Sequence, residues 1–274
     1  MKKIFDEIVN GLNDYVHANN LQSLVLGISG GIDSTVCAAI CHEVEKLNKG
    51  EIKFYGISLP CSTNSDEEND SAESCMRAFC RVGNFWTENL QKESSLLFST
   101  CTEHIGLTPI GRGNIKARLR MIYLYDLAQK TRGIVIDTDN LTEHYLGFFT
   151  LHGDQGDIKP IGRFWKHEVY DLATWLKNSY YFGSAKIEAL EKAIQITPTD
   201  GNGVILGGGD LDQIAPGFNY DQVDKVLSRY VSGKTQDEII EEFCSSWEDA
   251  EENIKAIISR VERNKFKRLP IKIL

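Results

Sequence analysis

The chain has 274 residues and a formal net charge of −9, from 39 acidic and 30 basic side chains. This acidic balance argues against broad binding to nucleic acid or to an anionic membrane surface, because both need a basic patch. It leaves room for a small anionic ligand that is held by a few local cations. A chain of this length can bury most of its apolar surface without disulfides or structural metals, and its hydrophobic fraction of 42% is ordinary for a globular protein.

The cysteines and the first residues bear on the compartment. Seven cysteines occur, and none forms a CxxC pair. Cys37 and Cys41 have the spacing of small core residues on one helix face, which disfavours zinc or disulfide roles. Residues 1–20 predict an amphipathic helix rather than a signal peptide, and no apolar stretch reaches transmembrane length. We therefore expect a cytoplasmic protein with reduced thiols and no membrane partner.

Strands and helices alternate after the N-terminal helix. Apolar runs predict buried strands at 23–29, 52–59 and 133–138. Helical periodicity predicts helices at 34–49, 65–83 and 114–132. This alternation predicts an α/β fold, a doubly wound, Rossmann-like parallel sheet with helices on both faces. Ligands of such sheets collect at the carboxyl ends of the strands, where the sequences SGGIDS and DTDN lie.

Beyond residue 160 the sequence predicts helices without strands. They cover 166–178, 184–194, 219–231, 235–243 and 247–264, and a basic tail follows. We expect a single domain, 1–274, with a nucleotide-binding core at 21–195 and a helical C-terminal portion at 219–274. The glycine-rich stretch 196–218 lies between them. It is either a surface linker or a lid over the functional site.

The stretch LGISGGIDST (26–35) carries the strongest local signal. Gly30 and Gly31 can adopt positive φ and let backbone N–H groups approach an anion closely. The helix that follows directs its N-terminal N–H groups to the same point. Asp33 would repel phosphates there unless Mg²⁺ bridged its carboxylate to phosphate oxygens. The alternative interpretation is an ordinary strand–helix turn in which Asp33 is the N-cap.

The loop SGGIDS after a strand resembles the pyrophosphate-binding loop of the N-type ATP pyrophosphatases. Three further segments are similar to NAD synthetases in order and spacing: GNIKARLRMIYLYDLA (113–128), DTDNLTEHYLGFFTLHGDQGDIKPIG (137–162) and FWKHEVYDLA (164–173). The resemblance implies a ligase in which the nicotinate carboxylate of deamido-NAD attacks ATP, pyrophosphate leaves, and ammonia then displaces AMP to give NAD. It also implies a homodimer. Since the chain has no room for an amidohydrolase domain, we expect free ammonia as the nitrogen donor.

The resemblance also assigns individual residues. Those that it places at ATP are Gly27, Ile28, Ser29, Gly30, Gly31, Ile32, Asp33, Ser34, Thr138, Lys166 and Thr199. Asp33 and Glu143 would hold Mg²⁺, and with Lys166 they make up the expected catalytic set. The residues that it places at deamido-NAD are Arg118, Asp157, Phe266 and Lys267.

Three positions depart from the family pattern. Asp137 stands where the family usually has glycine, and it adds an acid beside the nucleotide. Leu151 stands where many ammonia-using members carry a lysine. Lys159 replaces a common asparagine, and we expect its charge to compensate locally.

Two other functions stay open on the sequence. One is a related ligase that adenylates another acid or a tRNA base, although the acidic charge and the lack of an RNA-binding basic patch weigh against tRNA. The other is a nucleotide-binding or sensor protein without activity. Loss of Asp33 or Glu143 would have marked that case, and both residues are present.

Overall fold

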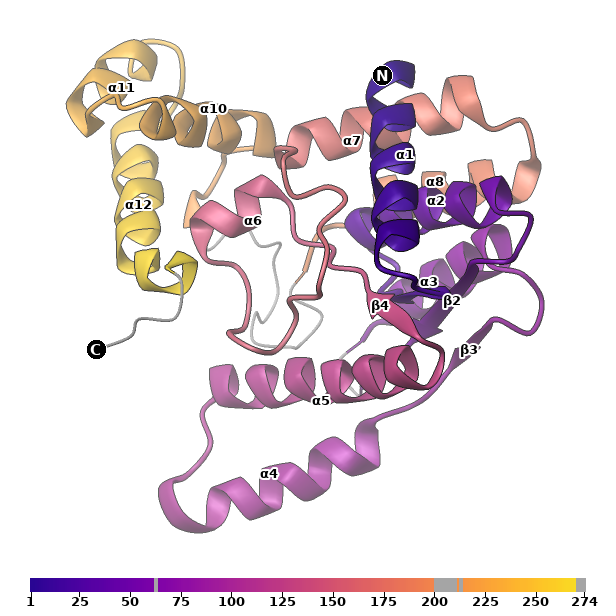
Figure 1. The fold of residues 1–274 in the computed structure, drawn as a ribbon. Helices are drawn as coiled ribbons and strands as arrows, with labels where there is room; N and C mark the ends of the chain where they lie inside the picture. Colours follow the sequence, from indigo (N-terminus) through magenta and orange to yellow (C-terminus); the bar gives the residue numbers. More distant parts are fainter. Residues whose placement is uncertain (62–63, 200–210, 212–213, 270–274) are drawn as a thin grey trace.

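The computed structural model describes residues 1–61, 64–199, 211 and 214–269 (Figure 1). The described strands form one parallel sheet in the order β3-β2-β1-β4. They are β1 (Ser23–Gly27), β2 (Lys53–Ser58), β3 (Phe85–Thr87) and β4 (Gly133–Val135). Ser23 of β1 pairs with Lys53 of β2 and with Gly133 of β4, so the carboxyl ends of these strands meet at one edge.

Helices cover both faces of this sheet, as the sequence predicts. Leu24 and Leu26 of β1 face a core that contains residues of α1 (Lys2–Ala18), α2 (Ile32–Leu47) and α3 (Asp66–Phe79). The same core contains residues of α7 (Lys166–Trp175) and α8 (Ser184–Gln195). Val25, between the two leucines, faces the opposite side, where it packs with Leu124 and Ala128 of α5 (Pro109–Lys130). Alternation along one strand thus builds two cores.

The region between 84 and 113 holds elements that the sequence pattern did not predict. Here lie β3 and α4 (Gln91–Ile105). The helix expected at 114–132 already begins at Pro109, because Thr108 caps it through a bond from the Gly111 N–H to its hydroxyl (3.0 Å). The helix expected at 65–83 ends at Phe79.

The C-terminal helices build a further core, separate from the two at the sheet, beside α6 (Leu141–Leu146). A π-helical turn, η1 (Leu176–Tyr180), continues α7. After it come α10 (Tyr220–Val231), α11 (Gln236–Phe243), α12 (Ala250–Arg263) and the short 3₁₀ helix η2 (Lys265–Arg268). Leu146 of α6 joins the core of these helices, and Figure 1 shows them to one side of the sheet. The C-terminal core therefore connects directly to the segment that carries Glu143.

Two further expectations concern the lid and the membrane. Most of the proposed lid, 200–210 and 212–213, lies outside the described residues, so its role stays a prediction. Within the described part of the chain, no helix combines the length and the apolar character needed to span a bilayer. Cys37 and Cys41 are buried as core residues, in agreement with their spacing.

Candidate active site

The loop between β1 and α2 needs glycine at one of its two glycine positions. Gly30 has a φ of +89°, and a Cβ atom there would lie 2.3 Å from the Glu68 carbonyl oxygen. Only glycine fits such a position. Gly31 has a φ of −74° and is the N-cap residue of α2, so the expectation of positive φ is confirmed for Gly30 and wrong for Gly31.

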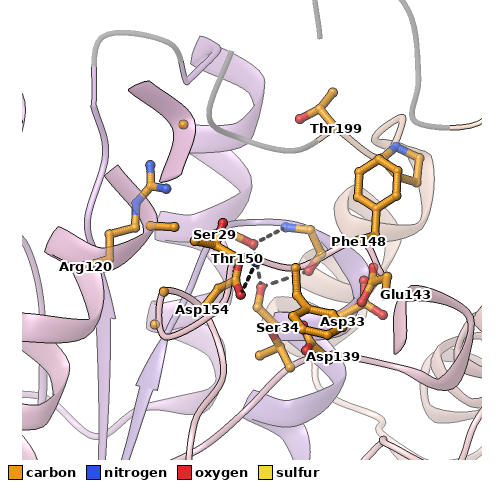
Figure 2. Close-up of a pocket in the computed structure, with 18 of the residues that line it drawn as sticks. Ser29, Asp33, Ser34, Arg120, Asp139, Glu143, Phe148, Thr150, Asp154 and Thr199 are labelled. Atoms are coloured by element: carbon orange, nitrogen blue, oxygen red, sulfur yellow. Dashed lines mark hydrogen bonds between the residues drawn. The ribbon is translucent and has the colours of Figure 1, made fainter. Parts of the chain in front are cut away.

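Two hydroxyl groups flank the start of α2. The Ser29 and Ser34 oxygens lie 3.1 Å apart, and Ser34 also donates to the Gly31 carbonyl oxygen at 3.0 Å. Figure 2 shows Ser29, Asp33 and Ser34 gathered on one wall of a cavity. Hydroxyl groups and a helix N-terminus at the same point are suited to an anion.

Asp33 does not act as the N-cap, so that interpretation of the loop is wrong. The N-cap of α2 is Gly31, and it makes no side-chain cap. One Asp33 oxygen instead accepts a hydrogen bond from the Asn140 side-chain amide at 2.9 Å. The other forms an ion pair with the Lys166 ammonium group. The Asp33 carboxylate thus points away from its own helix and toward α6 and α7.

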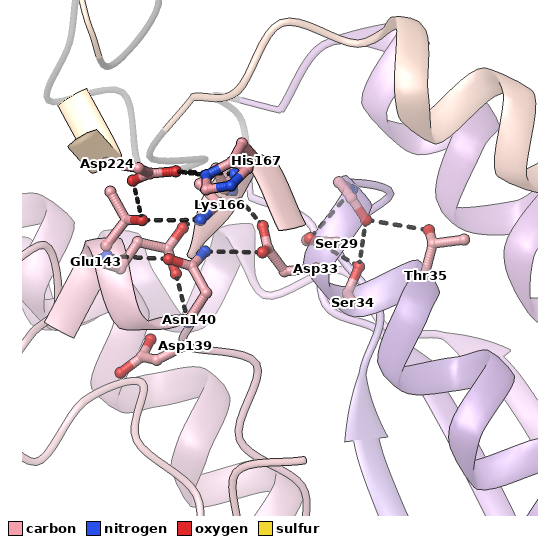
Figure 3. A network of polar contacts seen from close by, with 12 residues as sticks. Ser29, Asp33, Ser34, Thr35, Asp139, Asn140, Glu143, Lys166, His167 and Asp224 are labelled. Carbon is pink, nitrogen blue, oxygen red and sulfur yellow. Dashed lines mark hydrogen bonds and ion pairs between the residues drawn. The ribbon is translucent and has the colours of Figure 1, made fainter. Parts of the chain in front are cut away.

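Lys166 joins the two carboxylates that were predicted to work together. Its ammonium group pairs with Asp33 and also with Glu143 at 3.1 Å, and Figure 3 shows it between them. Only 2% of Lys166 is exposed. Burial alone would lower the pKa of this lysine, but the two carboxylates outweigh that effect and raise its pKa above the usual range. Lys166 is therefore a buried, permanently charged cation.

The surroundings of Glu143 raise its pKa. Burial raises the pKa of Glu143 to about 8; the Asp33 charge adds to the rise, and the ion pair with Lys166 opposes it. Asn140 anchors Glu143 through a capping box: the Glu143 N–H donates to the Asn140 side chain at 3.0 Å, and the Asn140 N–H donates to Glu143 at 3.2 Å. One asparagine thus contacts both carboxylates.

A buried network that the sequence did not reveal fixes the backbone of Lys166. The Lys166 N–H donates to the Thr142 hydroxyl at 2.8 Å, and that hydroxyl donates to Asp224 of α10. Asp224 also accepts from the His167 N–H at 2.9 Å and contacts the His167 ring at 2.8 Å. Because Asp224 is 1% exposed, these bonds tie α6, α7 and α10 together at the first turn of α7.

The strand ends open into a cavity of about 800 Å³ (Figure 2). Most of the predicted ATP and catalytic residues line it. They are Gly27, Ile28, Ser29, Gly31, Ile32, Asp33, Ser34, Thr138, Glu143, Lys166 and Thr199. Lys267, predicted at deamido-NAD, lines it as well.

Three predicted deamido-NAD residues lie outside this lining. Arg118 is exposed and donates to the Leu151 carbonyl oxygen at 3.1 Å. Asp157 is exposed, accepts from the Tyr125 hydroxyl at 2.9 Å, and accepts from the Val135 N–H of β4 at 3.0 Å. Phe266 is 58% exposed. Their assignment to the substrate stays a prediction.

Other lining residues were missed. Arg120 lies on the cavity side of α5, where Arg118 does not, and donates to the Leu59 carbonyl oxygen at 2.9 Å. Asp154 accepts two bonds from the Thr150 N–H, at 2.8 and 2.9 Å. Burial and then the Asp139 charge raise the pKa of Asp154 to about 7. Its carboxyl can accept or release a proton near neutral pH. Only the excess of acids at 137–157 could have pointed to it.

The departures at 137 and 159 contact each other. Lys159 pairs with Asp137 at 3.3 Å and with Asp139 at 2.8 Å. Asp137 is 1% exposed and accepts from the N–H groups of Gly156 (2.9 Å) and Asp139 (2.8 Å). Burial raises the pKa of Asp137, and the Lys159 charge opposes that rise, so the expected local compensation by Lys159 is confirmed.

A parallel sheet with a glycine-containing loop and a helix N-terminus at its strand ends defines an α/β nucleotide-binding protein. Comparison with protein families narrows this class. The model of the family described as NAD synthase matches residues 4–270, so the chain belongs to the NAD synthase family.

Curated relatives and solved structures agree with this family. The chain is 31% identical to the "NH(3)-dependent NAD(+) synthetase" of Methanocaldococcus jannaschii, over 98% of this chain and 95% of the relative. It is 29% identical to the protein of the same name from Wolinella succinogenes, over 96% of this chain and 92% of the relative. Two solved structures show the same fold. Each is 24% identical to this chain, and each match covers 100% of this chain and 98% of the other. They are NMN synthetase from Francisella tularensis, with a TM-score of 0.77, and NH3-dependent NAD synthetase from Campylobacter jejuni, with 0.72.

Proposed function

We propose that this protein forms NAD from deamido-NAD by ATP-dependent amidation with ammonia. The nicotinate carboxylate takes up AMP from ATP, pyrophosphate leaves, and ammonia then displaces AMP. The observation that carries this proposal is that Lys166 forms ion pairs with both Asp33 and Glu143. All three residues line one cavity, beside the loop between β1 and α2. Relatives of nearly equal length bear the name NH3-dependent NAD synthetase.

The reaction needs positive charge at this loop. The attacking carboxylate and the attacked α-phosphate are both anions, so they approach only where positive charge is preorganised. Lys166 supplies a charge that its ion pairs keep in place. The N–H groups at the start of α2 supply further donors. We assign Lys166 to the ATP phosphates on this basis.

The residues present fit a magnesium ion. Asp33 and Glu143 offer hard oxygen ligands, and both already face one cation, the Lys166 ammonium group. No cluster of three or more His, Cys, Asp or Glu side chains suited to a metal occurs among the described residues. Mg²⁺ is commonly held by one or two carboxylates and substrate phosphates. When bound, the ion neutralises phosphate charge.

The dinucleotide site extends this proposal. We keep Arg118, Asp157, Phe266 and Lys267 as deamido-NAD residues and propose a homodimer that acts in the cytoplasm. Arg118 and Phe266 are both exposed outside the cavity lining. They can contact a substrate in the cavity if that substrate extends out of it, toward a second subunit.

A product assay tests the proposal. Purified protein with ATP, Mg²⁺, ammonium and deamido-NAD is expected to yield NAD, AMP and pyrophosphate in equal amounts. Glutamine in place of ammonium is expected to support little turnover. Release of ADP and phosphate would contradict the proposed chemistry. One structural neighbour is named NMN synthetase, so the assay also includes nicotinate mononucleotide as an alternative substrate. If that acid turned over faster than deamido-NAD, it would be the preferred substrate of this protein.

A further inference from the structure

Five cationic side chains of the described residues line the cavity, and they differ in the contacts that they make within the protein. They are Arg120, Lys166, Arg260, Arg263 and Lys267. Substrates of the proposed reaction carry several phosphate charges, while the whole protein carries a net charge of −9. Long-range attraction therefore does not favour these substrates, and local cations must hold them.

Four of the five cations already have partners within the protein. Lys166 pairs with two carboxylates. Lys267 donates to the carbonyl oxygens of Gly147 (2.8 Å) and Phe149 (2.6 Å). These carbonyls belong to the segment that follows α6, so two hydrogen bonds of the Lys267 ammonium group are made to that segment.

The two arginines with partners are likewise bound to backbone. Arg120 donates to Leu59, as described above. Arg260 donates to the Leu146 carbonyl oxygen at 3.1 Å, and its guanidinium group lies 4.5 Å from the centre of the Phe148 ring. Each guanidinium group thus helps to hold the cavity wall in shape.

Arg263 is different. It lies in the last turn of α12, its side chain is exposed, and it lines the cavity. Within the part of the chain that the structure describes, its guanidinium group has no hydrogen bond, ion pair or ring contact. Basic residues are common in the last turn of a helix because they favour the helix dipole. That preference does not explain a position on the cavity wall where none of the five N–H donors bonds to a described residue.

We propose that Arg263 binds a phosphate oxygen of the dinucleotide substrate and thereby sets the affinity for it. This inference rests on the proposed function. Arg263 and Lys267 are one helical turn apart and lie on the wall formed by α12 and η2. The loop Gly31–Ser34 and Lys166, which we assign to ATP, belong to the wall at the strand ends. A guanidinium group can hold two phosphate oxygens at once, which a lysine cannot.

The test replaces Arg263 and a matched neighbour. Arg263→Met removes the charge and keeps much of the side-chain volume. Arg263→Lys keeps the charge but removes the planar guanidinium group that can bind two oxygens. The control is Lys265→Met, because Lys265 is exposed in the following turn and does not line the cavity. For Arg263→Met, the KM for deamido-NAD is expected to rise about 10- to 100-fold, as for the loss of a charged hydrogen bond. The KM for ATP, kcat and the Tm should change little.

The remaining variants and outcomes separate this inference from the proposed function. Arg263→Lys should give an intermediate KM for deamido-NAD, and Lys265→Met should behave as the wild type. Calorimetric titration of deamido-NAD into each protein gives the same comparison without turnover. An unchanged affinity in Arg263→Met, with an active wild type, would overturn the inference alone. An equal rise in the KM for ATP would also overturn it. A wild type that neither binds nor turns over deamido-NAD would overturn the proposed function itself.

Discussion

Asp33→Asn and Glu143→Gln are each expected to slow AMP formation by about 10²- to 10³-fold, the usual effect of removing one electrostatic contact from a transition state. Both changes keep the shape of the side chain and remove its charge. In the folded protein the two carboxylates face the same ammonium group, although 110 positions separate them in the sequence (143 − 33). The double variant should be little worse than either single variant, because residues that act as one unit are not additive.

Single-turnover AMP formation across a magnesium titration measures this effect. Each single variant retains one carboxylate, so high Mg²⁺ should restore part of its rate, and the double variant should gain little. Asp126→Asn is a matched control, since Asp126 is an exposed carboxylate that forms an ion pair with Lys130 on the same helix. Independent, multiplicative losses with an unchanged magnesium dependence would show that Asp33 and Glu143 do not share a metal.

These two substitutions should also lower stability, because Lys166 is buried between the carboxylates. Removing one partner of a buried pair costs up to about 3–5 kcal/mol when the charge is left unpaired. Lys166 would keep one partner, so a smaller loss is expected. Thermal unfolding of each variant shows the temperature below which the kinetic comparison is made with fully folded protein.

Lys166→Met is expected to have the second large effect: it should lower the rate of AMP formation and raise the affinity of the ligand-free protein for Mg²⁺. Loss of a charge at the ATP phosphates should slow AMP formation by about 10²-fold or more. In the ligand-free protein, however, Lys166 neutralises the carboxylates that we assign to Mg²⁺. Its removal leaves two uncompensated acids, so the affinity of the ligand-free protein for Mg²⁺ should rise.

Calorimetric titration with Mg²⁺ alone, in the absence of nucleotide, measures this second effect. Lys192→Met provides the control, because Lys192 pairs with the exposed acids Asp70 and Glu188 and does not line the cavity. It should leave both the rate and the Mg²⁺ affinity unchanged. A lower or equal Mg²⁺ affinity in Lys166→Met would contradict the assignment of Asp33 and Glu143 as the metal ligands.

The sequence predicted those parts of the fold whose signals are local and long enough. The strands β1, β2 and β4 and the helices around them produce clear apolar runs or helical periods. Phe85–Thr87 is a strand of three residues, which is too short to form a pattern. Leu96 and Leu97 of α4 are exposed at 68% and 38%, so that helix lacks the apolar stripe by which buried helices are recognised.

The candidate site divides in the same way. The loop SGGIDS is contiguous, so its place between a strand end and a helix start could be predicted from the sequence. The bonds that connect Asn140 with Asp33 and Thr142 with Asp224 join residues far apart in the sequence, and no spacing predicts them. Arg118 and Arg120 differ by two positions on one helix, and only the folded helix shows that Arg120 is the one that faces the cavity. The charges of Asp137 and Lys159 were visible in the sequence, but their contact depends on the bridge between Ile136 and Ile158.

Carboxylate activation by this site is tested most directly by following the carboxylate oxygens. The substrate is deamido-NAD with ¹⁸O in both oxygens of its nicotinate carboxylate. It is converted with ATP, Mg²⁺ and ammonium, and mass spectrometry measures the ¹⁸O content of each product. Attack of the carboxylate on the α-phosphate predicts that one labelled oxygen appears in AMP and one stays in the amide of NAD. Pyrophosphate should carry none. Label in orthophosphate or pyrophosphate, or unlabelled AMP alongside NAD, would contradict adenylation at this site.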